Sequence, residues 1–335
     1  MIYPWNRPLW ERLRARPGGP AGAVLLAGPR GLGKRAFACV LAQGILCRSP
    51  QPDGEPCGVC ASCHLFESRS HPDFRLVEPA DDEPATEPAL GGTPGLRGPR
   101  VIMVSQVRAL ADFLAITSHL GGAKVVLIQP ADRMHISAAN ALLKTLEEPM
   151  PGTVFLLVAD RPHRLPSTVR SRCFRIDFQI PPRDMALDWL AAKRTIDPEV
   201  ALAQAGFAPL AAERLGQGGY WDRRRALNEL LVSPPKDPGD LAAQMDTEEM
   251  PTMYHLLYRW CHDLVSARIA GRVRYNPDCA ENLLRLADNA DVLELDSLAK
   301  ELIAALRALD HPLNPRLVIE QLAIRYTRMM ARQPS

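Results

Sequence analysis

Short apolar runs alternate with helix-length amphipathic segments along the first half of the chain. The runs are rich in Val, Ile and Leu and show no alternating polar face, which is typical of strands buried on both sides. Such strands, separated by helices, form a parallel sheet with helices packed on both faces. The pattern therefore predicts an α/β domain, with strands at 23–28, 124–129, 154–158 and 174–178.

The apolar pattern changes after Pro181-Pro182. From there to the end, apolar residues recur at spacings of three and four, which predicts an all-α region. A glycine-rich break at 216–219 divides this region into a small helical part and a larger one. We expect three long helices in the larger part, at 254–269, 295–309 and 316–331.

Three further segments complete the expected organisation of the first half. The spacing predicts helices at 105–114 and 137–148, the second with Ser137 as its N-cap. Residues 78–100 are rich in Pro, Gly and acidic residues, and they carry too few apolar side chains to offset the entropy lost on ordering. We expect this segment to be a mobile loop.

Overall charge and composition exclude some classes of function. The 335 residues carry a formal net charge of +2, so no overall field marks the chain as a nucleic-acid binder. No apolar run approaches the ~18 residues that a membrane-spanning helix needs. The sequence also begins without the layout of a signal peptide. These features indicate a cytoplasmic protein.

Four of the eight cysteines are clustered, at Cys47, Cys57, Cys60 and Cys63. Two overlapping Cys-x-x-Cys pairs and one upstream cysteine supply four thiolates, the closed ligand set that structural Zn²⁺ prefers. The simpler alternatives are a redox pair or four unligated thiols. An iron–sulfur cluster is disfavoured, because Glu67 stands where the bacterial ferredoxin run requires a further cysteine. The spacing therefore predicts a structural zinc site without an open position for catalysis.

Other cysteines and two histidines bear on this prediction. His64 and His71 are alternative ligands, although four cysteines already complete the shell. Cys39, Cys261 and Cys279 lie in apolar surroundings, which predicts that they are core residues.

A glycine-rich loop follows the first expected strand and opens a helix. It reads Gly28-Pro-Arg-Gly31-Leu-Gly33-Lys34-Arg35 and matches the phosphate-binding loop G-x-x-x-x-G-K-[ST] except at its last position. In a working loop, backbone N–H groups cradle phosphate, the lysine neutralises its charge and the final hydroxyl binds Mg²⁺. Gly28, Gly31, Gly33 and Lys34 thus form a degenerate loop, either a plain glycine turn or a weak phosphate site. We expect no productive binding of ATP and Mg²⁺, because Arg35 lacks the hydroxyl.

The acidic motif that an ATPase carries after its next buried strand is also degraded. Carboxylates at that place bind Mg²⁺ and help to position the attacking water. The chain instead has Gln129-Pro130-Ala131-Asp132. Asp132 lies too far along the chain to serve, so we interpret it as a residue that caps a turn or a helix.

Three motifs of the first half strongly resemble the clamp-loader ATPases of bacterial DNA polymerase III. They are Asn140-Ala-Leu-Leu-Lys-Thr-Leu-Glu-Glu-Pro149, Val154-Phe-Leu-Leu-Val158 and Leu165-Pro-Ser-Thr-Val-Arg-Ser-Arg-Cys173. The resemblance implies an AAA+ fold with a phosphate loop, a RecA-like parallel sheet and three domains. Residues 1–180 would form the nucleotide-binding-like domain with an inserted zinc module at 47–63, 181–220 a helical lid and 221–335 a helical collar.

Further departures from the ATPase pattern imply a particular role in that family. Active relatives carry a polar sensor residue, usually Thr, where Ala159 and Asp160 stand, and a lid arginine that the matching stretch Gly206–Pro209 lacks. The resemblance implies a stator subunit that does not hydrolyse ATP. Its partners in the family are the gamma/tau ATPases and the delta subunit of a heteropentamer, which loads a sliding clamp onto primed DNA within the polymerase holoenzyme.

Ser171-Arg172-Cys173 matches the Ser-Arg-Cys motif of the family, in which the arginine reaches the ATP site of a neighbouring subunit. A guanidinium is always charged and can bridge phosphate oxygens as charge spreads in the transition state. The resemblance implies that Arg172 is an arginine finger that acts in trans, with Ser171 and Cys173 as its motif neighbours. An ordinary salt-bridged arginine is the alternative.

Two other functions stay open at this point. A catalytically active clamp-loader-type ATPase with unusual ligands would hydrolyse ATP as an isolated chain. A zinc-dependent DNA-binding module would show a strong, salt-dependent affinity for DNA, but the cysteine segment has few basic and aromatic residues.

Overall fold

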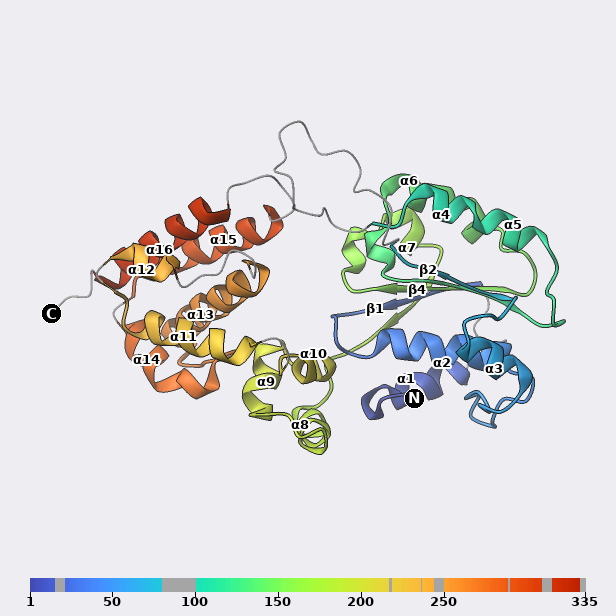
Figure 1. Cartoon of the computed structure of the whole chain (residues 1–335), viewed down its shortest axis with the longest axis horizontal. Coiled ribbons are helices and arrows are strands. Elements are labelled where there is room, and N and C mark those ends of the chain that lie inside the picture. Colours follow the sequence, from blue (N-terminus) through green and yellow to red (C-terminus); the bar gives the residue numbers. More distant parts are fainter. Residues whose placement is uncertain are drawn as a thin grey trace. The chain divides into compact units, whose positions relative to one another are not determined.

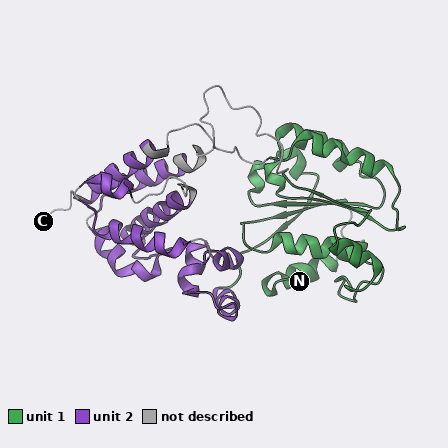
Figure 2. Ribbon diagram, viewed as in Figure 1, with its two compact units in different colours: residues 1–86, 99–182 green, residues 87–98, 183–335 purple. Residues whose placement is uncertain are grey.

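The computed structural model describes residues 1–15, 22–79, 101–216, 219–235, 237–243, 250–288, 290–308 and 315–331. The loop expected at 78–100 falls outside them except for its first two residues. The chain divides into two compact units (Figure 2). We call residues 1–86 with 99–182 the sheet unit, and residues 87–98 with 183–335 the helical unit.

The sheet unit contains a five-stranded parallel sheet in the order β2-β3-β4-β1-β5. All residues of the central strands β3 and β4 are buried, which explains their continuous apolar sequences. The α/β prediction is confirmed, and four of the strands lie where the pattern placed them. The strands are β1 (Gly22–Ala27), β2 (Phe74–Val77), β3 (Lys124–Ile128), β4 (Thr153–Ala159) and β5 (Phe174–Asp177).

β2 was not expected from the sequence. It is an edge strand of the sheet, and its two middle residues, Arg75 and Leu76, are exposed. A strand that is buried at only one position leaves no apolar run to recognise.

Helices cover both faces of this sheet, α1 to α3 on one face and α4 to α7 on the other (Figure 1). The expected helix at 105–114 is two helices, and the expected N-cap Ser137 is wrong. His135 is the N-cap of α6, and its Nδ1 accepts the Ser137 N–H at 3.3 Å. The helices are α1 (Arg7–Arg14), α2 (Lys34–Leu46), α3 (Ala61–Glu67), α4 (Val104–Arg108), α5 (Leu110–Ala115), α6 (Ile136–Glu147) and α7 (Ser167–Arg170).

The carboxyl ends of the strands bring distant parts of the sequence together. Ala27 at the end of β1 pairs with Ala159 of β4 on one side and with Asp177 of β5 on the other. The residues that follow these strands therefore share one edge of the sheet, the edge at which open α/β sheets place their ligands.

The helical unit contains two apolar clusters. One joins α8 to α10, the other joins α11 to α16, and the side chain of Trp221 packs against both. A division into lid and collar near residue 220 stays a prediction. The helices are α8 (Arg183–Ala192), α9 (Pro198–Gln204), α10 (Pro209–Arg214), α11 (Tyr220–Val232), α12 (Pro238–Ala243), α13 (Met250–Ala270), α14 (Ala280–Asp288), α15 (Val292–Ala308) and α16 (Pro315–Ala331).

Buried hydrogen bonds fix α9 to its surroundings in this unit. The side chain of Gln204 is fully buried, and its Nε2 donates to the carbonyl oxygen of Tyr275 at 2.7 Å and to Oδ1 of Asn276 at 2.8 Å. Its Oε1 accepts the hydroxyl hydrogen of Tyr220 at 2.7 Å. The end of α9 is thereby tied to the start of α11 and to the loop that precedes α14.

Replacing Tyr326 with Phe should destabilise the protein. The Tyr326 hydroxyl donates to Leu231 O at 2.7 Å and accepts from Trp260 Nε1 at 2.9 Å, in a core where all three groups are buried. Losing this hydroxyl leaves two buried polar groups unpaired, which costs about 1–3 kcal/mol each at most. Urea denaturation should show the loss as a lower midpoint. Tyr254→Phe is the matched control, because the buried Tyr254 has no side-chain hydrogen bond to a described residue; equal losses in both variants would contradict this explanation.

Candidate functional site

The predicted phosphate loop connects β1 to α2 at the carboxyl edge of the sheet. Its three glycines have positive φ angles, 146° at Gly28, 87° at Gly31 and 89° at Gly33, a region that other residues rarely adopt. A Cβ atom on Gly28 would also lie 2.6 Å from the carbonyl oxygen of Phe178. The glycine pattern of the sequence therefore corresponds to a real constraint on the backbone.

Lys34 lies at the start of α2, with its side chain only 3% exposed. Its Nζ donates to the carbonyl oxygen of Pro29 at 2.6 Å and forms an ion pair with Oδ1 of Asp160 at 2.7 Å. The lysine that would neutralise a phosphate is thus already neutralised within the chain.

Asp132 holds the turn that carries Asp160. Oδ1 of Asp132 accepts the backbone N–H of Asp160 at 2.9 Å, and Oδ2 accepts that of Arg161 at 3.2 Å. Asp132 itself lies in the short 3₁₀ turn η2 (Ala131–Arg133) after β3. The interpretation of Asp132 as a turn-capping residue is confirmed.

The two positions at which an ATPase places its magnesium ligands both bind the same glutamate. Nη2 of Arg35 lies 3.2 Å from Oε1 of Glu78, and Nε2 of Gln129 donates to that oxygen at 3.0 Å. Gln129 is joined to Pro130 by a cis peptide bond. Arg35 is cationic and offers no ligand to a cation, and the Gln129 amide nitrogen is bound to Glu78, so a polar bridge stands where an ATPase has its magnesium hydroxyl and carboxylate. Oε1 of Gln129 is buried and has no hydrogen-bond partner among the described residues.

The N-terminal segment braces the outer side of the loop. Leu32 O accepts hydrogen bonds from Trp5 Nε1 at 3.0 Å and from Asn6 Nδ2 at 2.8 Å. A Cβ on Gly33 would lie 2.5 Å from the ring of Tyr3. This contact could not be predicted from the sequence, because it joins segments that only the tertiary structure brings together.

Arg172 lies just after α7, and its side chain is 33% exposed. Its Nε donates to Oε1 of Glu147, the last residue of α6, at 2.7 Å, and its Nη2 pairs with the same oxygen. Its Nη1 donates to the carbonyl oxygen of Thr168 at 2.9 Å. A guanidinium has five N–H groups, so each Nη keeps one N–H beyond these bonds.

The motif neighbours of Arg172 shape the turn. Oγ of Ser171 donates to the Thr168 carbonyl oxygen at 3.1 Å, and Sγ of Cys173 donates to that of Val169 at 3.2 Å. Burial raises the pKa of the Cys173 thiol to about 11. Cys173 is therefore a packed thiol beneath the turn, and Arg172 is the motif residue that carries charge.

The four clustered cysteines converge between the end of α2 and the start of α3, with all four sulfur atoms within 4.8 Å of one another. Sulfurs that bind one ion at about 2.3 Å from tetrahedral corners lie ~3.8 Å apart. The Sγ separations are 3.5 Å for Cys47–Cys57, 3.8 Å for Cys47–Cys60, 3.7 Å for Cys47–Cys63 and 4.0 Å for Cys57–Cys63. The group can hold a tetrahedral metal ion.

The thiols of the cluster differ in acidity. Burial opposes ionisation of Cys60, but backbone N–H groups of Arg48 and Cys63 stabilise the thiolate, and the pKa falls to about 6. Burial raises the pKa of Cys63 to about 12. A metal ion that ligates all four must therefore displace protons from this set.

His71 supports the cluster from outside the ligand set. Its buried ring has Nε2 2.9 Å from Oγ of Ser62, which donates to Leu46 O at 2.5 Å, and its Nδ1 accepts the N–H of Asp73 at 3.1 Å. Both ring nitrogens are engaged, so His71 is not a ligand. His64 is also absent from the group of described residues that can hold a metal.

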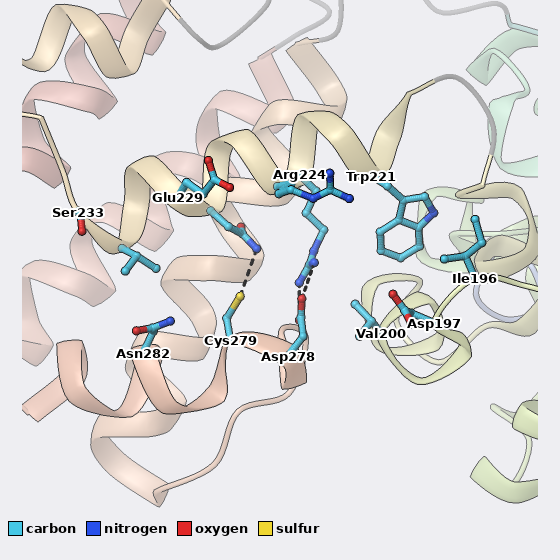
Figure 3. A pocket seen from close by; sticks show the side chains of 13 residues that line it. Ile196, Asp197, Val200, Trp221, Arg224, Glu229, Ser233, Asp278, Cys279 and Asn282 are labelled. Carbon is cyan, nitrogen blue, oxygen red and sulfur yellow. Dashed lines mark hydrogen bonds and ion pairs between the residues drawn. The ribbon is translucent and has the colours of Figure 1, made fainter.

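A pocket of about 570 Å³ belongs to the helical unit, and none of the predicted site residues lines it (Figure 3). Its walls come from α9, α11 and the start of α14. Arg224 bridges it by a bidentate pair with Asp278, at 2.6 and 2.8 Å, and Asn228 Nδ2 lies 3.5 Å from Cys279 Sγ. The charge of the buried Arg224 is already neutralised by Asp278. The pocket is therefore no better a candidate for a ligand site than the phosphate loop at the carboxyl edge of the sheet.

Among the described residues, no helix is both long enough and apolar enough to cross a membrane.

Comparisons with known proteins agree with the motifs. A family model described as "DNA polymerase III, delta subunit" matches residues 13–182, and one described as "DNA polymerase III, delta subunit, C terminal" matches residues 218–328. The chain is 38% identical over 300 residues to "DNA polymerase III subunit delta'" of Pseudomonas aeruginosa, covering 88% of this chain and 84% of that protein.

A second relative and a solved structure extend the comparison. The chain is 32% identical over 304 residues to "DNA polymerase III subunit delta'" of Escherichia coli (strain K12), covering 88% of this chain and 86% of that protein. The structure of a gamma subunit-related protein from Thermotoga maritima aligns over 97% of this chain and 99% of that chain, with 18% identity and a TM-score of 0.45. On the sequence matches, the chain belongs to the delta-prime family of DNA polymerase III subunits.

Proposed function

We propose that this chain is the subunit of a clamp loader that does not hydrolyse ATP and that lends Arg172 to the ATP site of a neighbouring subunit. Its partners are the gamma/tau and delta subunits of a heteropentamer, which loads the sliding clamp onto primed DNA in the cytoplasm. Residues 181–220 act as the lid, and residues 221–335 form the collar that packs against other subunits. The observation that carries the proposal is the contrast between the exposed Arg172 and the enclosed Lys34.

Arg172 is suited to leave its present partner. Its ion pair with Glu147 is exposed, with the two side chains 33% and 47% accessible, and exposed pairs contribute about 0–1 kcal/mol. An arginine finger accelerates phosphoryl transfer by ~10³–10⁵, about 4–7 kcal/mol of transition-state stabilisation. A neighbouring γ-phosphate therefore competes easily with Glu147 for the guanidinium.

The chain's own loop is suited to no such reaction. Lys34 is paired with Asp160, and Arg35 is bound to Glu78 where a hydroxyl would hold Mg²⁺. Without the loop hydroxyl and a free lysine, two of the groups that stabilise charge on a γ-phosphate in the ground state and in the transition state are lost. These contacts favour the non-hydrolysing role over an active ATPase with unusual ligands.

Replacing Arg172 with Ala in a reconstituted loader should leave assembly normal and lower the ATPase rate stimulated by DNA and clamp. We expect a fall by a factor of about two or more, because one neighbouring site loses its trans-acting charge. Arg175→Ala is the matched control, since Arg175 lies three residues further on and pairs with Asp177 at 2.7 Å. Intact assembly with an unchanged rate in Arg172→Ala would refute the finger assignment.

The isolated wild-type chain should hydrolyse ATP no faster than the buffer blank. Lys34→Ala should give the same rate, because the lysine is already bound to Asp160 and Pro29. A phosphate-release assay measures both. Turnover above background that Lys34→Ala abolishes would establish the ATPase alternative instead.

We also propose that the four-cysteine group binds one structural zinc ion. All four donors are cysteine sulfurs, and their separations suit a tetrahedral ion. Four ligands fill a tetrahedral shell, so no coordination position remains open for a substrate. The ion would join the end of α2 to the start of α3. Its role is to hold this module together and not to catalyse a reaction.

Replacing Cys60 with Ser should reduce the zinc content of the purified chain from one ion towards none and lower its thermal stability. The reason is that three thiolates and a hydroxyl bind zinc far more weakly than four thiolates. Atomic absorption and thermal unfolding measure the two effects. Cys39→Ser, on α2 outside the group, should keep the metal. Full zinc retention in Cys60→Ser would show that the ligand set is wrong.

A further inference from the structure

The Lys34–Asp160 ion pair occupies the phosphate loop from within. Nζ of Lys34 has three N–H groups; one is directed to Pro29 O at 2.6 Å and another to Asp160 Oδ1 at 2.7 Å. The lysine side chain is 3% exposed, so water has little access to it. Any phosphate bound in the loop would need this same amine.

The fold specifies where the Asp160 carboxylate lies. β4 and β1 are parallel neighbours, with Ala159 beside Ala27, so the residue after β4 emerges next to the loop after β1. Asp132, from the turn after β3, accepts the backbone N–H groups of Asp160 and Arg161. Three strand ends therefore cooperate to direct one carboxylate at the amine of Lys34.

From this geometry we propose that Asp160 is the built-in anion of the loop and that it excludes the β-phosphate of a nucleoside diphosphate or triphosphate. The inference rests on the proposed non-hydrolysing function and deepens it by naming the residue that keeps nucleotide out of the loop. The missing magnesium hydroxyl at Arg35 removes only a metal contact. The lysine and the loop glycines would still form an anion site if Asp160 did not fill it.

Electrostatics make the exclusion effective. A phosphate that reached Lys34 would come within a few ångströms of the Asp160 carboxylate, and like charges at ~4–6 Å disfavour each other strongly. Because Lys34 is buried, ions in solution screen this repulsion poorly. Conversely, a neutral residue at position 160 leaves a buried ammonium without its anion, a state that a bound phosphate relieves.

Isothermal titration calorimetry of the full chain with ADP and with inorganic pyrophosphate, each with and without Mg²⁺, tests the proposal. The wild type should show no binding up to millimolar ligand. Asp160→Asn and Asp160→Ser should each gain affinity by roughly tenfold or more over the wild-type limit, because the repelling charge is gone. The double variant Lys34→Ala with Asp160→Asn should lose that gain.

Asp177→Asn is the matched control. Asp177 ends β5 at the same edge of the sheet, beside Ala27, and pairs with Arg175 and not with Lys34. The substitution removes the same charge without freeing the lysine, so it should not create binding. An equal gain in Asp177→Asn would overturn the proposal, because net charge and not the ion pair would then control access.

Three other results would also overturn it. The first is ADP binding by the wild type that Lys34→Ala abolishes. The second is no binding by Asp160→Asn and Asp160→Ser when both variants are folded. The third is that circular dichroism shows both variants to be unfolded, which would assign Asp160 to stability alone. Each is distinct from a failure of the trans role, which is read from Arg172→Ala in the reconstituted loader. Absence of ADP binding by the folded Asp160 variants, together with the expected Arg172→Ala effect in the loader, refutes this inference and leaves that role intact.

Discussion

The pairing of β1 between β4 and β5 is the constraint on which the rest of the sheet unit depends. β1 is buried along almost its whole length, and its end meets the ends of two parallel neighbours. Burial on both faces fixes the register, because a slip by one residue would turn apolar side chains towards the wrong layer. Once the register is fixed, the glycine loop, the turn of Asp160 and the end of β5 must lie together. The chemistry of this edge follows from strand order before any individual contact is considered.

Two cations of this unit, Lys34 and Arg172, both have a carboxylate partner in the chain, but their surroundings give the two pairs different consequences. The Lys34–Asp160 pair is enclosed on the lysine side, where attraction between opposite charges is strong and little screened. The Arg172–Glu147 pair is open to water, where the same attraction is weak and readily exchanged. One pair can therefore be permanent and the other temporary, although both consist of a basic and an acidic side chain.

Much of the fold could be read from the sequence, because continuous apolar runs and three-to-four spacing report burial directly. β3, β4 and the long C-terminal helices were found for that reason, whereas β2 was missed because its middle residues are exposed. The cysteine group was predictable because its members are close in sequence. The partner of Lys34 was not, since Asp160 is distant in the chain and became its neighbour only through the strand order.

The hydrogen bonds of Gln204 have a mechanical consequence. They connect α9 to the first residue of α11 and to the segment at 275–276, and each is buried or partly buried. A flexible joint needs a few residues that can change conformation without breaking such contacts. Nη1 of Arg259, on α13, also donates to Gln204 Oε1 at 3.4 Å and to the Tyr220 hydroxyl at 3.3 Å. Displacing α9 by itself would break these bonds of Gln204 together, so a displacement of α9 is transmitted to α11 and α13.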